Sequence, residues 1–381
     1  MTSSLICSIR PAEIHYTIDF HYNLLEECSF LAKFVSGLGS KIAIISNNVV
    51  GPLYGESLCR SLVSQGLESH LFIFEDGEKF KTRETKGKLE EQMLEKKYGR
   101  DTCIIALGGG VVMDISGFIA STFCRGIPLV MIPTSLLGMV DASIGGKTAV
   151  NLTYGKNLIG TIYQPKKVII DSSVLKTLPL RELKNGLTEM IKHAIILDAS
   201  YFSYLEKHVE DLLHLEQDKM NQAIYTSCQI KKTIVESDEK ELGLRRILNF
   251  GHTIGHALEK VSHYQIAHGE AVAIGILVES YLSFLTGYLS KKALDSILTL
   301  VHQFNFPFKL PCEVNNQSII TAMQMDKKAT RSQARFVMIN EIGSTLDFDG
   351  NYCTTLDLEP INKALNWMFH DLCSHSRAFF S

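Results

Sequence analysis

The stretch TCIIALGGGVVMDISGFIAS, residues 102–121, joins an apolar run to a helix-like segment through three consecutive glycines. TCIIAL has the length and β-branched content of a buried strand. Glycines after a strand let the backbone approach a ligand closely, and the next helix offers free N–H groups to a diphosphate. The stretch predicts a strand, loop and helix of a nucleotide-binding sheet. Because the G-x-G-x-x-G pattern is missing, a tight structural turn is the alternative interpretation of the loop.

The same alternation continues on both sides of this stretch. Apolar β-branched runs stand at 41–46, 71–74, 128–133 and 167–171, with amphipathic segments at 53–66 and 85–99. This order predicts a parallel sheet covered by helices, a Rossmann-like α/β domain over residues 1–177. From about Thr177 the apolar residues recur at helical spacing, which predicts a mainly α-helical domain over residues 178–381. Pro179 is expected to open its first long helix, and the sequence after Phe348 shows no clear pattern.

Composition excludes several classes of protein. The chain has 381 residues, 45% of them hydrophobic, a net charge of −3 and nine cysteines without a C-x-x-C pair. This charge gives no general attraction for nucleic acid or for an anionic membrane. No apolar run reaches the roughly 18–20 residues that span a bilayer, and the N-terminus is not typical of a secretory signal. We therefore expect a cytoplasmic globular protein with reduced thiols and with neither nucleic acid nor membrane as a partner.

A second glycine-rich segment, DASIGGKTAVN, covers residues 141–151. It ends like a Walker A loop, but Asp141 stands where that motif needs glycine, which argues against a P-loop nucleotidase. Lys147, Lys156 and Asn157 could bind an oxyanion from flexible backbone. A solvated loop is the alternative.

Four histidines stand in NFGHTIGHALEKVSHYQIAHGEAV, residues 249–272. His252 and His256 are four residues apart and would share one helical face. Thr253 occupies the position where the H-E-x-x-H metalloprotease motif needs glutamate, so peptidase chemistry has no general base. Spacing alone selects His252 and His256 as a metal pair.

His268 could add a third ligand to that pair, and Glu189 a carboxylate. Two or three histidines with a carboxylate and an open position are typical of catalytic zinc. The alternative for Glu189 is an ordinary helical pair with Lys192 or His193.

Taken together, these segments resemble the 3-dehydroquinate synthase family of sugar phosphate cyclases. The similarity runs in order from about residue 40 to residue 343 and is most specific in the central segments. These include DGEKFKT (76–82), ALGGGVVMD (106–114), VDASIGGKTAVNLTYGKNLIG (140–160), LKTLPLRELKNGLTEMIK (175–192), IKKTIVESDEKELGLRRILNFGHTIGHALE (230–259) and HGEAVAIG (268–275).

The resemblance implies an NAD- and metal-dependent lyase with its site in the cleft between the two domains. It places one Zn²⁺ or Co²⁺ per subunit on Glu189, His252 and His268, and it gives His256 to the substrate phosphate instead. The implied NAD site consists of Asn47, Asp76, Gly77, Glu78, Lys81, Gly108, Gly109, Gly110, Val111, Val112, Met113, Asp114, Thr134, Ser135, Lys147, Lys156, Val174, Leu175, Lys176 and Thr177.

The implied substrate is the sugar phosphate 3-deoxy-D-arabino-heptulosonate 7-phosphate, and the products are 3-dehydroquinate and phosphate. The route is transient oxidation by NAD, phosphate elimination, reduction, ring opening and intramolecular aldol closure. Arg125 is expected to reach the site from the neighbouring subunit of a homodimer. The implied catalytic and substrate residues are Asp141, Lys147, Asn157, Lys192, Lys231, Arg245, Asn249, His256, Lys327 and Arg125.

Three positions depart from the family pattern. Met113 replaces a glycine of the phosphate loop, where it would crowd the diphosphate or shift the backbone. Asn47 stands where the family often has aspartate, and the segment DKKATRSQARF (326–336) has no glycine where one is common. No metal ligand or phosphate-binding base is lost.

Other classes share parts of this pattern. A polyol dehydrogenase of the glycerol dehydrogenase type has the same two-domain plan but needs no cluster of bases such as Lys147, Lys231, Arg245 and Lys327. A 2-deoxy-scyllo-inosose-type cyclase acts on a substrate that has no carboxylate. Arg245 and Lys231 would bind a carboxylate, so these two bases argue against this class. A decayed homologue that only binds nucleotide would not be expected to keep every ligand and base.

Overall fold

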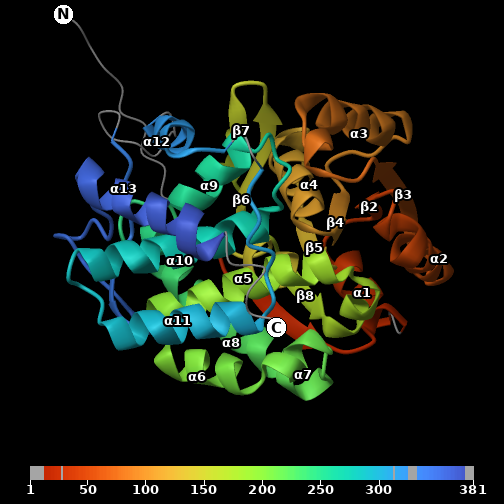
Figure 1. Cartoon of the computed structure of the whole chain (residues 1–381). Helices are drawn as coiled ribbons and strands as arrows, with labels where there is room; N and C mark the ends of the chain where they lie inside the picture. The colour runs from red at the N-terminus through yellow and green to blue at the C-terminus, as the bar shows by residue number, and fades with distance from the viewer. Residues whose placement is uncertain (1–12, 27–28, 312–313, 325–332, 374–381) are drawn as a thin grey trace, which may run out of the picture.

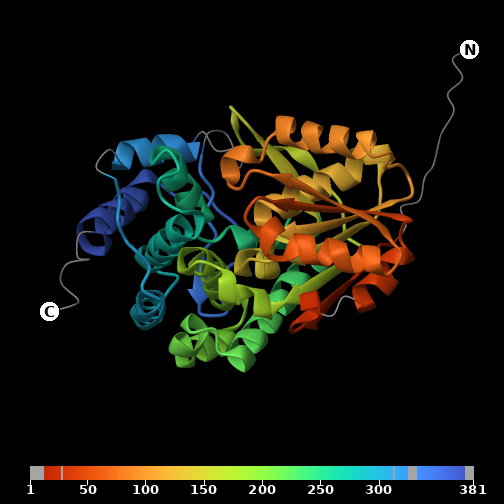
Figure 2. The same ribbon diagram turned by 90° about the vertical axis from the view of Figure 1, so that its right-hand side faces the viewer.

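The computed structural model describes residues 13–26, 29–311, 314–324 and 333–373. A parallel sheet forms one part of the molecule, and helices form the other (Figures 1 and 2). The sheet has six strands in the order β1 (Thr17–His21), β8 (Lys167–Asp171), β5 (Leu129–Pro133), β4 (Thr102–Gly108), β2 (Lys41–Asn47) and β3 (Glu68–Phe74). All neighbouring pairs are parallel, so the predicted Rossmann-like sheet is confirmed.

Helices cover both faces of the sheet. Along β2, Ile42 and Ile44 face one core, whereas Ala43 and Ile45 face the other, as the two-residue period of a strand requires. The first core includes apolar residues of α1 (Ser29–Ser36) and α2 (Glu56–Ser64). The second includes residues of α3 (Arg83–Glu95) and α4 (Gly110–Thr122). Because both faces are buried, the strands are almost continuously apolar.

Two β-structures in the first half of the chain were not predicted. Strand β1 joins the sheet edge beside β8. The segment expected to be a loop around Lys147 forms an antiparallel hairpin of β6 (Lys147–Leu152) and β7 (Gly155–Ile162). Gly160 permits the close pairing, because a Cβ there would lie 1.8 Å from the Thr148 carbonyl oxygen. The hairpin places Lys147, Lys156 and Asn157 on paired strands.

The rest of the described chain is mainly helical. The sequence predicts Pro179 as the first residue of the first long helix. In the structure Pro179 is the N-cap, and the helix begins at Leu180. The sequence after Phe348, which shows no clear pattern, contains a further helix. Before it, β9 (Ile339–Glu341) pairs with β10 (Ser344–Thr345). In the described residues no helix has the length and apolarity to cross a bilayer. The helices are α5 (Leu180–Leu197), α6 (Ala199–Lys207), α7 (Val209–Leu213), α8 (Gln217–Ser237), α9 (His252–Val261), α10 (His268–Leu285), α11 (Lys291–Gln303), α12 (Asn316–Gln324) and α13 (Leu358–Trp367).

Short helical turns connect these elements. They are η1 (Leu24–Glu26), η2 (Gly51–Gly55), η3 (Glu78–Phe80), η4 (Phe123–Arg125), η5 (Gly138–Ala142), η6 (Ser172–Thr177), η7 (Leu244–Asn249) and η8 (Met368–Leu372).

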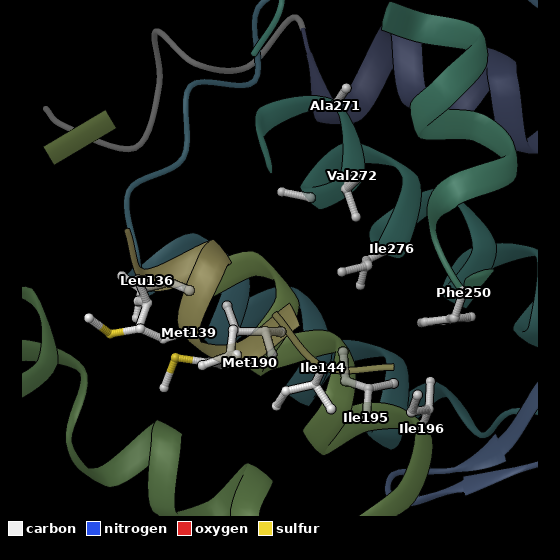
Figure 3. Close-up of a cluster of buried hydrophobic side chains, with 14 of the residues drawn as sticks. Leu136, Met139, Ile144, Met190, Ile195, Ile196, Phe250, Ala271, Val272 and Ile276 are labelled. Atoms are coloured by element: carbon white, nitrogen blue, oxygen red, sulfur yellow. The ribbon is translucent and has the colours of Figure 1, made fainter. Parts of the chain in front are cut away.

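Helices α9 and α10 pack closely through glycines. A Cβ at Gly275 would lie 1.9 Å from the Gly251 carbonyl oxygen, and one at Gly255 would lie 3.1 Å from the Val272 Cα. Gly251 also has a φ of 79°, which favours glycine. Val272 and Ile276 of α10 contribute to the apolar cluster that reaches α5 below (Figure 3). This packing sets the distance between the first residues of the two helices, His252 and His268.

We expect Gly275→Ala to destabilise the protein by about 1–3 kcal/mol, because the added methyl overpacks the contact between α9 and α10. Gly87→Ala is the matched control, since a Cβ at this helical position meets nothing within 4 Å. That variant should be neutral or slightly more stable. Urea unfolding of both variants would check this, and equal midpoints for Gly275→Ala and the unchanged protein would contradict it.

Candidate active site

Three helices bring a carboxylate and two imidazoles together. The predicted residues Glu189 of α5, His252 of α9 and His268 of α10 can each direct one donor atom to a common point, with these atoms within 4.8 Å of one another. Glu189 Oε1 lies 3.5 Å from His252 Nε2 and 4.0 Å from His268 Nε2. This oxygen is buried and has no hydrogen-bond partner among the described residues. A buried carboxylate oxygen without a partner is costly unless a cation completes the site.

The other atoms of these ligands are held by neighbours. His252 Nδ1 donates to the Phe250 carbonyl at 3.2 Å, and His268 Nδ1 donates to Glu259 Oε2 at 3.2 Å. Glu189 Oε2 accepts from Lys192 Nζ. With Nδ1 protonated, each neutral ring has its lone pair on Nε2, the atom that faces Glu189. Hydrogen-bond partners on Nδ1 orient metal-bound histidines in the same way. Two imidazole nitrogens and one carboxylate oxygen fit a catalytic zinc-like ion.

His256 lies beside this cluster. Its ring centroid is 5.2 Å from that of His252 and 6.1 Å from that of His268. Donor atoms of His256, Glu259 and His268 form a second group within 4.8 Å of one another, and Glu189 is not part of it. His252 and His256, the metal pair that sequence spacing alone selects, therefore lie close together. The Glu189 carboxylate, however, lies near His252 and His268, the pair that the family resemblance implies.

Glu279, which the sequence interpretation did not include, holds the start of α9. Its fully buried carboxylate on α10 accepts from Gly251 N at 2.9 Å and from Thr253 N at 3.2 Å. A carboxylate at a helix N-terminus satisfies free N–H groups and the helix dipole. Since His252 is the first residue of α9, Glu279 helps to set the position of that imidazole.

A charged pair of the buried Lys231 and the partly exposed Asp141 lies next to the cluster. Lys231 of α8 donates to the Asp141 carboxylate, and Asp141 belongs to the turn η5. Burial alone would raise the pKa of Asp141, but the ammonium groups of Lys231 and Lys192 outweigh it and lower that pKa. Burial also lowers the pKa of Lys231. His193 is buried with Nδ1 2.7 Å from Ser227 Oγ, and burial lowers its pKa to about 3. It is therefore neutral at physiological pH.

Arg245 extends the basic cluster from η7. The side chain is buried, and Nη2 donates to the Gly145 carbonyl at 3.1 Å while Nη1 donates to the Glu239 carbonyl. Its Nε is buried without a hydrogen-bond partner among the described residues. Burial lowers the pKa of Arg245 below that of an exposed guanidinium. Arg245 nevertheless stays charged.

Glu241 is a second carboxylate that the sequence did not reveal. It forms an ion pair with Lys147 of β6, and its Oε1 accepts from Asn249 Nδ2 at 2.6 Å. Both partners were predicted to face the substrate. No spacing rule could identify Glu241, because its pairing with β6 depends on the tertiary fold.

Lys81 lies between the glycine loop helix and the hairpin. Its ammonium group pairs with Asp114 of α4 and donates to Asn157 Oδ1 at 2.6 Å. Burial would lower the pKa of Lys81, but the negative charges of Asp114 and Glu78 and the hydrogen bond to Asp114 together outweigh it and raise that pKa. Lys81, Asp114 and Asn157, three predicted residues from separate segments, therefore form one polar cluster in the first half of α4.

The glycine loop follows β4 at a switch point of the sheet. The chain leaves β2 toward β3 on one side and leaves β4 toward β5 on the other, so a crevice is expected at their carboxyl ends. Gly109 is the N-cap of α4, where no side chain caps the helix. A Cβ at Gly109 would lie 3.2 Å from Ser135 Oγ, and Thr134 N donates to the Gly108 carbonyl at 2.8 Å. This open helix end fits a diphosphate.

The predicted residues at β2 and β3 also meet. Asn47, the last residue of β2, accepts from Val50 N at 2.8 Å and donates to Asp76. Glu78 Oε1 accepts from Asn151 Nδ2 at 2.7 Å, and Gly77 has a φ of 110°. Asn47 thus connects the two strand ends.

Several predicted NAD residues are buried in the core. Met113 is fully buried with the apolar residues beneath α4, so its side chain does not crowd the diphosphate side of the loop. The side chains of Val112, Val174 and Leu175 are buried as well, and these residues can offer only backbone groups to a cofactor. Val111 is only partly buried.

Three further predicted residues make contacts within the described part of the chain. Lys156 Nζ pairs with Glu259 Oε1 at 2.8 Å. Thr177 Oγ1 lies 2.6 Å from the Tyr54 hydroxyl. Lys176 Nζ lies 5.3 Å from the Tyr22 ring centroid. Lys327 falls outside the described residues.

Arg125 is exposed and adopts a left-handed conformation with a φ of 70° at the end of η4. Helix α4 ends three residues earlier, at Thr122, so Arg125 does not belong to its last turn. In the part of the chain that the structure describes, nothing forms an ion pair or hydrogen bond with its guanidinium.

This combination of a parallel nucleotide-type sheet and a helical part carrying the carboxylate–histidine cluster is the architecture of the sugar phosphate cyclases. A 2-epi-5-epi-valiolone synthase from Streptomyces hygroscopicus, solved with NAD⁺ and Zn²⁺ bound, has a TM-score of 0.86 at 28% identity, over 95% of this chain and 99% of that one. Residues 71–185 match the family described as 3-dehydroquinate synthase N-terminal, and residues 186–329 match 3-dehydroquinate synthase C-terminal. The chain belongs to the 3-dehydroquinate synthase family.

Curated relatives of this family are similar in sequence over most of this chain. A 3-dehydroquinate synthase of Thermoanaerobacter pseudethanolicus is 42% identical over 363 residues, which cover 94% of this chain and 99% of the relative. One of Vibrio atlanticus is 41% identical over 338 residues, 88% of this chain and 93% of the relative.

Proposed function

We propose that this protein is a 3-dehydroquinate synthase that converts 3-deoxy-D-arabino-heptulosonate 7-phosphate to 3-dehydroquinate and phosphate. One observation carries the proposal. The partnerless oxygen of Glu189 faces His252 and His268 beside a cluster of buried bases, in a chain of this family. The proposal thus places a metal site next to an anion site, as a reaction on a phosphorylated polyol requires.

Glu189, His252 and His268 would hold one Zn²⁺ or Co²⁺, and the glycine loop with the ends of β2, β3 and β5 would hold NAD. A metal held there would supply Lewis-acid polarisation of the substrate hydroxyls, and NAD would supply a reversible hydride acceptor. The neighbour solved with NAD⁺ and Zn²⁺ supports this pair of cofactors.

The bases of the chain would bind the two ends of the substrate. Lys147, Asn157, His256 and Lys327 suit the phosphate, since charge-assisted hydrogen bonds strengthen as it leaves with more negative charge. Arg245 and Lys231 suit the carboxylate, with arginine able to bind both oxygens. Lys192, Asp141 and Asn249 would orient the substrate between these ends.

The assembly and location are part of the same proposal. Residues 1–177 would form the NAD-binding domain and residues 178–381 the metal- and substrate-binding domain. The enzyme would act in the cytoplasm as a homodimer, with Arg125 supplied to the partner's site. Its exposure, and its lack of a described partner within the chain, support a role outside its own subunit.

The proposed activity predicts phosphate release without net formation of NADH. The assay contains purified protein, the heptulosonate 7-phosphate, Zn²⁺ or Co²⁺, and NAD⁺ at a small fraction of the substrate concentration. All the substrate should be converted, because each hydride that NAD⁺ takes is given back to the same reacting molecule and NAD⁺ is regenerated. Chelation should stop the reaction, and added metal should restore it. Phosphate and absorbance at the NADH wavelength would be followed together. NADH growing in proportion to product would instead indicate a polyol dehydrogenase.

A further inference from the structure

Glu259 contacts both the metal cluster and the hairpin of the nucleotide site. It lies on the third turn of α9 and is 4% exposed. Its Oε2 accepts from His268 Nδ1 at 3.2 Å, and its Oε1 lies 2.8 Å from Lys156 Nζ. His268 begins α10 in the helical part, whereas Lys156 belongs to β7. One carboxylate thus joins two elements that are separate in sequence and in function.

The first contact determines how His268 presents its other nitrogen. A carboxylate can only accept from Nδ1, so Nδ1 carries the proton and the neutral ring has its lone pair on Nε2. That Nε2 is the atom 4.0 Å from Glu189 Oε1. Outer partners of this kind orient the ring and raise its basicity, and their loss weakens metal binding roughly 10- to 100-fold.

The second contact determines where the Lys156 ammonium lies. Its side chain is 29% exposed, and Nζ also lies 4.3 Å from the Tyr264 ring centroid. The Glu259 carboxylate and the aromatic face therefore hold this cation against the helical part of the molecule. An ordered Lys156 loses less conformational freedom when it meets an anionic cofactor.

We propose that Glu259 is a positioning residue that couples the metal site to the nucleotide site, with one oxygen orienting His268 and the other holding Lys156. The inference rests on the assignment of those two sites under the proposed function. A cation held by His268 Nε2 would polarise the ring and strengthen the Nδ1–H hydrogen bond to Glu259. Glu259 would then be held more firmly, and so would Lys156. Metal and NAD⁺ should each raise the affinity for the other by the same factor.

The test measures binding, without turnover. In the unchanged full-length protein, NAD⁺ should bind on the order of fivefold more tightly with Zn²⁺ than without it, as calorimetry would show. Glu259→Gln should lower Co²⁺ affinity roughly 10- to 100-fold in competition with a chelator. The factor by which metal raises NAD⁺ affinity should fall to about one in this variant. Lys156→Met should lose the coupling as well, while its Co²⁺ affinity stays within about threefold, because Oε2 still orients His268.

Glu270→Gln is the matched control. Glu270 caps α10, the helix that begins at His268, by accepting from Ala267 N at 3.0 Å, and it pairs with Arg181. If it acts only on the helix end, both the metal affinity and the coupling factor should stay within about twofold, since the cap leaves the His268 ring untouched. Equal loss in Glu259→Gln and Glu270→Gln would reduce Glu259 to a structural role and overturn the proposal. So would NAD⁺ affinity that metal does not change, or coupling that persists in Glu259→Gln.

The visible spectrum of bound Co²⁺ separates this inference from the assignment of the metal site. The spectrum should be retained in Glu259→Gln at saturating Co²⁺, because the ligands are unchanged, and it should change in His268→Ala. If Glu259→Gln altered the spectrum and Glu189→Gln did not, Glu259 would itself be a ligand. That outcome would overturn both the positioning role and the proposed metal site. Retained spectrum with intact coupling would overturn the positioning role alone.

Discussion

His268→Ala is expected to lower the affinity for Zn²⁺ or Co²⁺ by at least about 100-fold, whereas His256→Ala should keep it within about threefold. The expectation follows from the position of Glu189, whose partnerless Oε1 faces His252 and His268. Loss of an outer partner already weakens a metal site roughly 10- to 100-fold, and loss of a direct ligand should cost more. Metal content after dialysis and competition with a chelator would measure the affinities.

The second group of donors, His256, Glu259 and His268, makes this a sharp comparison. Both groups contain His268, so its loss alone does not separate them. Glu189→Gln and His252→Ala should weaken binding only if the metal lies where Glu189 points. If both variants kept the metal and His256→Ala lost it, the site would lie on the second group. His256→Ala should instead retain the metal and lose turnover of the phosphorylated substrate.

The sequence predicted those parts of the fold that follow a local pattern. The apolar runs of β2, β4 and β8 follow the composition of buried parallel strands, and the glycines after β4 mark a close approach of the backbone. Strand β1 and the hairpin around Lys147 were not predicted. The hairpin sequence follows Gly145 and Gly146 and contains Gly155 and Gly160, which is typical of loops, and its strand character comes from pairing across the turn.

The site shows the same limit. The residue types that bind metal could be selected from the sequence, but spacing favoured His252 with His256, because residues four apart share a helical face. The approach of Glu189, more than sixty residues earlier, depends on how α5 packs against α9 and α10. Glu241, Glu259 and Glu279 were not predicted for the same reason. Each acts through a tertiary contact. Glu241 and Glu259 stand beside other charged residues, as surface acids do, whereas Glu279 is the only charged residue of the apolar stretch 271–285.

Arg125→Ala is expected to cut turnover roughly tenfold or more while metal content and unfolding midpoint stay unchanged, because a charge-assisted bond to the substrate phosphate would be lost. A cation that merely offset the dipole of α4 would give the opposite result, a small loss of stability of about 0.3–1 kcal/mol with turnover intact. The structure makes the dipole role weak, since Arg125 lies beyond the last residue of α4, in a left-handed turn. Steady-state assays and urea unfolding of the same preparation would distinguish the two.

Subunit mixing then tests whether the guanidinium acts across a homodimer. Chains with Arg125→Ala keep Lys147, and chains with Lys147→Ala keep Arg125, so a mixed dimer holds one site with both groups intact. Random exchange of equal amounts makes half of the dimers mixed, so about a quarter of the original activity should return. Mixing Lys147→Ala with Asn249→Ala provides the control for geometry. Lys147 and Asn249 both contact Glu241 within one chain, which places them in the same site. A mixed dimer of these two variants has no intact site and should show no rescue. If exchange were confirmed by differently tagged chains and the mixture with Arg125→Ala stayed as inactive as this control, Arg125 would not be shared between subunits.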